Sequence, residues 1–345
     1  MRESIFSATI RVFLLAFFGV IGLILGVVVI AAIVGASTTA IDGAPQIDYK
    51  YTPEILANAK GVRKELSKDA PVILQLNIKG VIGLDNLTQH SVGQQLLESR
   101  ERVLDDRVKA ILLYIDSPGG TVVDADGIYR EIKKYKEIHK TPVYAYVDGL
   151  CASGGMYIAS AADKIYASET SLVGSVGVIL PSILNFSQLL DKVGVQSLTL
   201  YDGKGKDNLN PLRPWVKGEE DNIKNAIDYY YGLFVNVVTS NRPQMDKTKL
   251  IDVYGANVYP AVQAQEFGYI DESNANLQNT LKLLAEKIDI KDDYYQVVSL
   301  ENKSWLSQLF KEKFELFSGH ITHQIELTPD LHPNLMGQYL YLYRP

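Results

Sequence analysis

The amino-acid sequence predicts an α/β protein built from βαβ units, with a mainly parallel sheet, right-handed crossovers and an N-terminal transmembrane helix. Two patterns predict the α/β class. Short apolar runs, typical of strands buried on both faces, alternate with longer segments whose apolar residues recur at helical spacing. Strands and helices that alternate in this way form βαβ units around one sheet. The third observation is a long uncharged apolar stretch near the N-terminus, which predicts the transmembrane helix.

The composition fits a globular protein and excludes several classes of function. The chain has 345 residues, of which 47% are hydrophobic and 21% charged, enough for one large domain or two smaller ones. Its net charge is -6 and its Lys and Arg residues are scattered, so we expect no nucleic-acid partner. Cys151 is the single cysteine, which excludes an internal disulfide and a metal site made of several thiolates.

Residues 1–36 are expected to anchor the protein in a membrane. Residues 12–34 are 23 consecutive apolar residues. A helix that rises about 1.5 Å per residue crosses the roughly 30 Å hydrocarbon core of a bilayer over this length. The alternatives are a cleavable signal peptide, whose apolar region is normally shorter, and a buried core helix. Arg2 and Arg11 precede the span and Asp42 follows it. The positive-inside rule therefore places the N-terminus in the cytoplasm and the rest of the chain outside.

Residues 37–70 are expected to form a linker and a short helix. Thr52 is a favoured N-cap, Pro53 suits the first helical position and Glu54 suits the first turn, so residues 52–66 fit a helix. The strand and helix alternation begins at residue 71. Its expected strands are residues 72–82, 108–115, 142–147 and 164–168, and the helices between them are residues 92–106 and 122–140.

Further elements follow in the same domain, and the sequence contains no internal repeat and no clear second domain. The expected elements are a helix over residues 185–194, a strand over 195–201, a long helix over 219–242 and short helices over 260–271 and 277–288. Residues 301–345 form a tail. Its residues 305–317 fit an amphipathic helix that packs against a neighbouring subunit or lies on the membrane surface.

Ser153 lies at a junction where reactive groups gather in α/β proteins. It follows a strand and is itself followed by Gly154, Gly155 and a helix-like segment. The N-terminus of a helix presents unpaired N–H groups and a partial positive charge. If Ser153 attacks a carbonyl group, the N–H of Gly154 faces the oxygen that gains negative charge. An N-cap serine, with glycines for tight packing, explains this segment equally well.

A second junction favours the catalytic interpretation of the first. Residues 112–120, "LLYIDSPGG", end another strand with a glycine pair before a helix, at the same edge of the predicted sheet. An oxyanion hole needs two N–H donors that converge from different places. Gly120, or its neighbour Gly119, can supply one donor and Gly154 the other. A turn closed by Pro-Gly explains the first motif alone but not the pair of motifs.

The base that would activate a serine is not identified by the residues alone. No histidine lies between residues 140 and 319, so a histidine-based triad is disfavoured. A Ser–Lys pair is the other precedent, in which an apolar setting keeps the lysine neutral. Composition does not choose among the lysines. Cys151, two residues before Ser153, fits a small buried residue better than a nucleophile.

Several motifs follow one another in order over residues 72–272, namely "DSPGG", "GLCASGGMYIASAADKIYA", "LVGSVGVI", "YDGKGKDNLNPLRP" and "NVYPAVQAQEFGYIDE". They resemble the motifs of the signal peptide peptidase family, the SppA-type serine peptidases also called protease IV, in the short single-copy form. The resemblance implies a ClpP/crotonase-like superhelical βαβ fold, with a Ser–Lys peptidase domain over residues 71–300. Met156 departs from the family, which often has an aromatic residue there.

Site residues follow from the resemblance position by position. It implies that Ser153 is the nucleophile, that Lys206 rather than Lys204 is the general base, and that Ser175 orients the lysine. It also implies that Gly120 and Gly154 donate to the oxyanion, with no metal and no cofactor.

The resemblance also implies how the protein works in the cell. It implies an oligomeric ring or dome in which the serine and lysine of one site can come from neighbouring subunits. The implied place is the bacterial inner membrane, with a single span and an extracytoplasmic catalytic domain. The implied substrates are remnant signal peptides and other apolar, membrane-proximal peptides. Two alternatives stay open, namely a crotonase-like enzyme acting on acyl thioesters and a catalytically silent membrane scaffold.

Overall fold

The structure is a computed structural model that describes residues 14, 17–23, 25–27, 51–101, 104–290, 292–302 and 338–343. The chain divides into a unit of residues 1–49 and a unit of residues 50–345. The described residues of the first unit are helical and exposed. No helix among the described residues is both long and apolar enough to cross a membrane. The other residues of the expected span 12–34 lie outside the described part of the chain.

A mixed sheet organises the second unit. Its nine strands, counted over the described residues, run in the order β1-β8-β2-β3-β4-β6-β7, with β5 paired to β4 and β9 paired to β3. The strands are β1 (Thr52–Leu56), β2 (Val72–Ile82), β3 (Val108–Thr121), β4 (Val143–Ala152), β5 (Lys164–Ala167), β6 (Leu172–Gly174), β7 (Val258–Pro260), β8 (Gln296–Glu301) and β9 (Leu340–Leu342). Neighbouring strands from β8 to β6 pair in parallel, whereas β1, β7 and β9 pair antiparallel to their neighbours. The α/β prediction with a mainly parallel centre is confirmed.

Helices cover both faces of the central strands. They are α2 (Gln89–Glu98), α3 (Val122–His139), α4 (Gly154–Ala159), α5 (Ser187–Lys192), α6 (Asp221–Asn241), α7 (Lys247–Lys249), the π-helical η1 (Leu250–Tyr254), α8 (Ala261–Glu266) and α9 (Leu277–Lys287). Successive side chains of a strand point to opposite faces. In β3, Ile111 and Leu113 therefore join the core under α2 and α3, and Leu112 joins a second core under α9. Two covered faces explain why these strands are apolar throughout.

Two of the expected elements were wrong. Residues 52–66 were expected to form a helix, but β1 pairs antiparallel with β8, and the Thr52 hydroxyl donates to the carbonyl of Glu301 over 3.3 Å. An edge strand tolerates Pro53. Pairing with β8, whose Glu301 is 249 residues further along the chain than Thr52, therefore outweighed the local helix-capping signals. Residues 195–201 form no strand and are exposed. Because β1 and β9 belong to the sheet, the sheet extends beyond the expected domain limits of 71 and 300.

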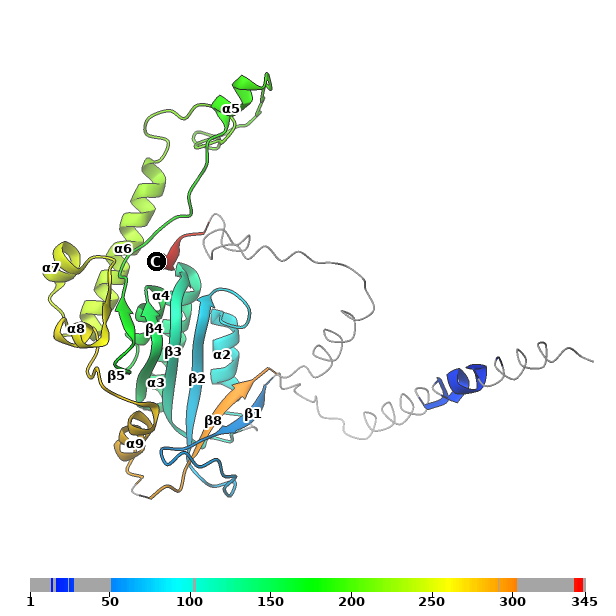
Figure 1. Ribbon diagram of the computed structural model, residues 1–345, viewed down its shortest axis with the longest axis vertical. Helices are drawn as coiled ribbons and strands as arrows, with labels where there is room; N and C mark the ends of the chain where they lie inside the picture. The colour runs from blue at the N-terminus through cyan, green and yellow to red at the C-terminus, as the bar shows by residue number, and fades with distance from the viewer. Residues whose placement is uncertain are drawn as a thin grey trace, which may run out of the picture. The chain divides into compact units, whose positions relative to one another are not determined.

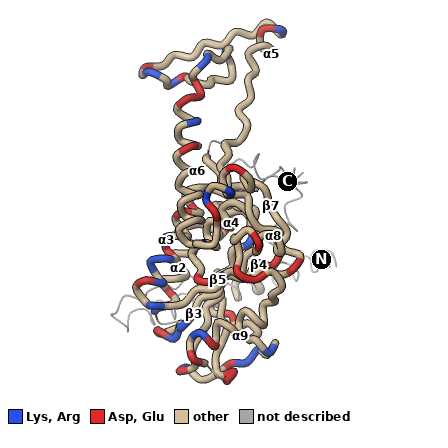
Figure 2. Tube along the Cα trace, turned by 90° about the vertical axis from the view of Figure 1, so that its left-hand side faces the viewer, with Lys and Arg blue, Asp and Glu red and all other residues tan. Residues whose placement is uncertain are grey.

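An arm of residues 180–220 separates β6 from α6. It contains α5 and projects beyond the sheet (Figure 1). Acidic and basic residues are mixed along it and along α6 (Figure 2). Many of its large apolar side chains are exposed, and Leu198 and Leu200 are each 84% exposed. The others are Ile183, Leu184, Phe186, Leu189, Val193, Val195, Tyr201, Leu212, Trp215 and Val216. An apolar surface of this extent is typical of a segment that a partner covers.

Candidate active site

Three neighbouring strands bring Ser153, Ser175 and the glycine pair to one edge of the sheet. β4 pairs in parallel with β6, and the last pair of that ladder is Ala152 with Gly174. Ser153 and Ser175 follow this pair directly, so they leave the sheet side by side. The Ser153 N–H donates to the Gly174 carbonyl over 2.9 Å, which fixes this arrangement. β3 runs along the other side of β4 and carries the glycine pair of the first junction.

The Ser153 side chain is held in an unusual state. Its backbone has φ 54 and ψ -118, and it occupies the N-cap position of α4 without making a side-chain cap hydrogen bond. The residue is 1% exposed, and its Oγ has no hydrogen-bond partner in the described part of the chain. A buried hydroxyl without a partner costs about 1–3 kcal/mol, and a strained backbone residue costs a similar amount. The simple N-cap interpretation of Ser153 is therefore wrong, and strain of this kind is typical of a reacting group.

The glycine pair of β3 packs directly against the residue that follows Ser153. Gly119 has φ 99, and a Cβ built on it would lie 2.7 Å from the amide nitrogen of Gly154. The hydroxyl of Ser117 accepts from the Gly119 N–H over 3.1 Å and donates to the Gly80 carbonyl over 2.6 Å, which fixes the turn. Only glycine permits this approach. The structure thus places the "SPGG" and "ASGG" motifs in contact.

The surroundings of Ser175 agree with its predicted place beside the nucleophile. The residue is 5% exposed and has φ 56. Its N–H donates to the Asn257 carbonyl over 2.7 Å, in the turn that leads into β7. The role of this hydroxyl in orienting a lysine stays a prediction.

Lys206 lies on the arm and does not reach Ser153 within one chain. The side chain is exposed, and Ser153 Oγ has no partner among the described residues. The Lys206 N–H donates to the Gly203 carbonyl over 3.1 Å, so the residue sits in a tight turn. A single chain therefore brings together Ser153, Ser175 and the glycines, but not the predicted base.

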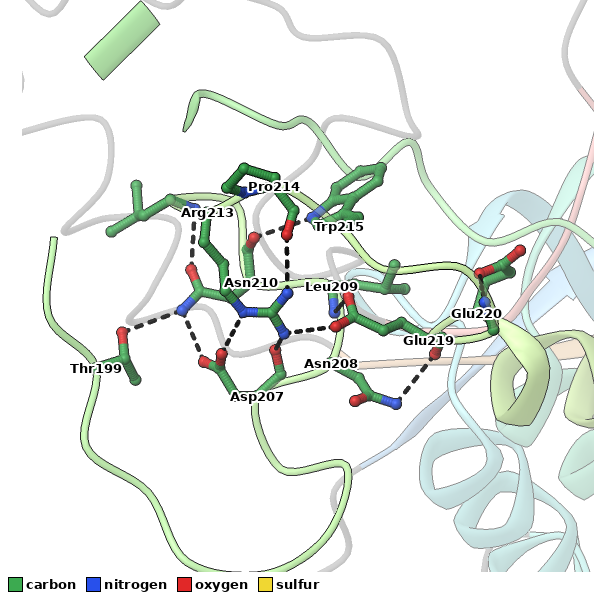
Figure 3. A network of polar contacts seen from close by, with 12 residues as sticks. Thr199, Asp207, Asn208, Leu209, Asn210, Arg213, Pro214, Trp215, Glu219 and Glu220 are labelled. Carbon is green, nitrogen blue, oxygen red and sulfur yellow. Dashed lines mark hydrogen bonds and ion pairs between the residues drawn. The ribbon is translucent and has the colours of Figure 1, made fainter. Parts of the chain in front are cut away.

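A network around Arg213 fixes the loop that carries Lys206 (Figure 3). The Arg213 guanidinium donates to a carboxylate oxygen of Asp207 over 2.6 Å and pairs with Glu219 over 2.7 Å. It also donates to the Asp207 carbonyl over 2.5 Å. The hydrogen bonds from Arg213 lower the pKa of Asp207 and the pKa of Glu219. Trp215 closes the loop by donating to the Asn210 carbonyl over 2.9 Å.

The alternative nucleophile, Cys151, and the described histidines do not form a catalytic pair at this edge of the sheet. Cys151 is fully buried, and burial raises the pKa of its thiol, as expected of a structural cysteine. His139 lies at the last residue of α3, where its ring packs on Tyr135 at 4.6 Å. His320, His323 and His332 lie outside the described residues, as does the expected helix over 305–317. No described histidine bonds to Ser153.

One element of the site was missed by the sequence analysis. β9 lies antiparallel to β3 with Tyr341 opposite Gly120, at the end of the sheet near α4 (Figure 1). Tyr341 is fully buried and packs on Tyr157 of α4 and Phe234 of α6, with ring centroids 5.1 Å and 4.5 Å away. The alternating "YLYLY" of the C-terminus is a strand signal that could have located β9. Nothing in the local sequence indicates its partner.

Comparisons with known proteins show which families the chain resembles. The Peptidase family S49 model matches residues 135–291, and the Clp protease model matches residues 65–172. A signal peptide peptidase SppA of Enterococcus faecium is 32% identical over 84% of this chain and 86% of its own length. A protease of Methanocaldococcus jannaschii is 31% identical over 61% of this chain and 66% of its own length. A ClpP1 mutant from Listeria monocytogenes superposes with a TM-score of 0.40 at 18% identity, over 62% of this chain and 96% of its own.

Proposed function

The chain belongs to the signal peptide peptidase SppA family of serine peptidases, and from that premise we propose that it is a membrane-anchored endopeptidase with a Ser–Lys dyad. Its proposed substrates are remnant signal peptides and other apolar peptides near the membrane. The observation that carries the proposal is the strained, buried and unpartnered Ser153 hydroxyl beside Gly154. The E. faecium relative bears the name of a signal peptide peptidase, which supports the substrate class.

The proposed chemistry assigns one role to each site residue. The Ser153 Oγ forms a bond to the scissile carbonyl carbon while its proton passes to the neutral amine of Lys206. The N–H groups of Gly120 and Gly154 stabilise the resulting oxyanion. Lys206 then protonates the leaving amine, and the C–N bond breaks. Water attacks the acyl carbon with its proton passing to Lys206, the bond between this carbon and the Ser153 Oγ breaks, and Lys206 returns the proton to Oγ. Ser175 orients the lysine.

The exposed arm supports a second copy of the chain as the source of Lys206. Leu198 and Leu200 are each 84% exposed on the arm, and Ser153 has no base within hydrogen-bond distance among the described residues of its own chain. We propose that the copies assemble into a ring or dome, so that the arm of one copy covers an apolar surface of the next and delivers Lys206. Residues 12–34 would hold the assembly on the inner membrane of a bacterium, with the catalytic unit outside the cytoplasm.

Substitution of the two dyad residues tests the mechanism directly. In the full-length protein in detergent micelles, we expect Ser153→Ala and Lys206→Ala each to abolish hydrolysis of a fluorogenic apolar peptide. Lys204→Ala, two positions earlier on the same loop, is the matched control and should keep activity. A serine-directed probe should label Ser153 and no other residue. Full activity in Lys206→Ala would rule out the proposed base, and a fully active Ser153→Ala protein would rule out the peptidase mechanism.

Mixing the two inactive variants tests whether the dyad forms between copies. If each site takes its serine from one copy and its lysine from the next, random equimolar assemblies hold both intact groups at about a quarter of their sites. We expect co-expressed Ser153→Ala and Lys206→Ala chains to recover activity to about that level. Mixed assemblies without any activity would show that both groups come from one copy.

A further inference from the structure

Asp-Gly pairs are places where a chain can modify itself without an enzyme. Glycine has no Cβ, so the nitrogen of the glycine can reach the carboxyl carbon of the aspartate before it. The chain has four such pairs, at residues 42–43, 126–127, 148–149 and 202–203. The first lies outside the described residues, and the structure gives the other three different surroundings.

In the pair on the arm, Asp202 and Gly203, the two reacting groups already lie together. The Gly203 N–H donates to Asp202 Oδ1 over 2.7 Å, and this carboxylate accepts no other hydrogen bond from the described residues. Both residues are exposed and lie outside any helix or strand. Gly203 has φ 99, and no atom lies within 4 Å of a Cβ built on it. The pair therefore has the contact, the space and the access to water that ring closure needs.

The pair in α3 is held apart by the helix. The Tyr157 hydroxyl donates to Asp126 over 2.9 Å, and Arg130 pairs with the other oxygen of this carboxylate over 2.9 Å. An N–H group inside an α-helix donates to the carbonyl four residues earlier, so the Gly127 nitrogen does not face its neighbour's side chain. Ring closure at Asp126 would require α3 to unwind locally.

The pair at the end of β4 is exposed like the pair on the arm, yet both of its reacting groups are bonded elsewhere. The Tyr114 hydroxyl donates to Asp148, and the Gly149 N–H donates to Ser171 Oγ over 3.2 Å. Burial and the bond to Asp148 raise the pKa of Tyr114, so its hydroxyl stays protonated and keeps donating. Exposure alone therefore does not distinguish the pairs, whereas hydrogen bonding does.

From this contrast we propose that Asp202 is a site of spontaneous isomerisation to isoaspartate, which inactivates the loop that carries Lys206. The Gly203 nitrogen forms a bond to Asp202 Cγ. The proton of that nitrogen and the hydroxyl of the protonated carboxyl group leave as one water molecule, and a five-membered succinimide ring results. Water then attacks the main-chain carbonyl carbon of Asp202, and its bond to the Gly203 nitrogen breaks. The net reaction gains and loses no atoms and needs only water.

The product changes the backbone shortly before the proposed base. The chain now runs through the Cβ and Cγ of Asp202, so it is one carbon atom longer, and a free carboxylate replaces the main-chain carbonyl. The Lys206 N–H donates to the Gly203 carbonyl over 3.1 Å, so a shift of Gly203 moves Lys206 as well. A misplacement of about 1 Å costs an enzyme roughly a hundredfold in rate. This loss of activity rests on the proposed function of Lys206, whereas the isomerisation does not.

Ageing an inactive protein tests the modification without relying on catalysis. Full-length Ser153→Ala protein in detergent micelles is incubated for weeks at body temperature and near-neutral pH. Isoaspartate is then measured with protein L-isoaspartate methyltransferase and labelled S-adenosylmethionine, and located by peptide mapping. We expect roughly tenfold to a hundredfold more at Asp202 than at Asp148 or Asp126, because these two must first break their hydrogen bonds. No isoaspartate at Asp202, or equal amounts at Asp202 and Asp148, would overturn the proposal.

Releasing the protected pair tests the reason for the difference. Tyr114→Phe removes the hydroxyl that donates to Asp148 and keeps the ring. In the same Ser153→Ala protein, we expect this substitution to raise isoaspartate at Asp148 by roughly threefold to tenfold and to leave the amount at Asp202 unchanged. An unchanged amount at Asp148 would contradict the protective role of the hydrogen bond.

The rate of peptide hydrolysis during ageing tests the consequence. In the Ser153-containing protein, kcat should fall in proportion to the isoaspartate at Asp202, with KM unchanged. Asp202→Glu cannot close a five-membered ring and should keep a larger fraction of its own initial rate. Asp191→Glu, at an exposed arm aspartate followed by a lysine, is the matched control and should age like the wild type.

The outcomes separate the modification from the proposed function. An equal decline in Asp202→Glu and in the wild type would overturn the inactivation by Asp202. If isoaspartate forms at Asp202 but fresh protein hydrolyses no peptide, the proposed function fails and the modification site stands.

Discussion

The contact between Gly119 and Gly154 makes a prediction that separates steric crowding from backbone strain. In Gly119→Ala, the new methyl group would overlap the Tyr341 carbonyl and lie 2.7 Å from the Gly154 nitrogen, so the two motifs must move apart. The φ of 99 adds left-handed strain of about 1–3 kcal/mol. Crowding in a packed region costs typically about 1–3 kcal/mol more.

Gly61→Ala is the matched control, because Gly61 also has a positive φ of 72 but no atom lies within 4 Å of its built Cβ. We expect this variant to lose only the strain contribution to the free energy of unfolding and to keep full activity. Gly119→Ala should lose more stability by urea denaturation. Because the added methyl group displaces the Gly154 N–H, the kcat of Gly119→Ala should fall by about a hundredfold to a thousandfold, which is the effect of losing one oxyanion donor.

The assay is steady-state hydrolysis of a fluorogenic peptide, at a temperature where denaturation curves show both variants folded. A Gly119→Ala protein with wild-type kcat would refute the inference that the contact of Gly119 with Gly154 holds the Gly154 N–H in the oxyanion site. Equal losses of stability in Gly119→Ala and Gly61→Ala would show that crowding between the new methyl group and Gly154 does not destabilise the protein.

Three further predictions concern the surroundings of the site. Because burial raises the pKa of the Cys151 thiol, iodoacetamide at pH 8 should alkylate it in urea but not in the folded protein, and rapid labelling of folded protein would contradict its burial. Arg213→Lys should keep probe labelling of Ser153 while kcat falls roughly tenfold to a hundredfold, because the lysine loop loses its bidentate anchor; unchanged kcat would exclude a positioning role. Hydrogen bonds from Arg213 lower the pKa of Asp207, so their contribution to loop stability is present above the ordinary carboxyl range and lost as pH falls below it. In a Trp305→Phe background, the emission of Trp215 should therefore shift to the red below about pH 4, and a constant spectrum to pH 2 would contradict the network.

The central part of the fold follows from local patterns. Residues 72–82 were predicted as a strand with the limits that β2 has, and α3 begins at the predicted residue 122 and ends within one residue of the predicted limit. Both are long elements whose side-chain period is set by the faces they bury. The two glycine motifs could be found for a related reason, since a helix that starts after a strand exposes its first N–H groups whatever the distant sequence is.

Elements whose partners lie far away in sequence could not be predicted. Residues 52–66 carry helix signals worth about 1 kcal/mol each. The first five of them instead pair with β8 as a strand, because an open sheet edge offers a whole row of hydrogen bonds. β9 was missed for the same reason, although its alternating residues fit a strand. The interpretation of Ser153 as an N-cap could be excluded only from its φ and its unpartnered hydroxyl.

The sequence by itself determined the α/β class, the glycine-flanked serine and the family, because these depend on residues close together in the chain. Only the tertiary structure decided that no described residue of the same chain serves Ser153 as a base, that Gly119 touches Gly154, and that Tyr341 lies in an aromatic pocket beside them. These three facts join residues brought together by packing between distant strands and helices. Such packing depends on the whole core and leaves no periodic trace in any one segment.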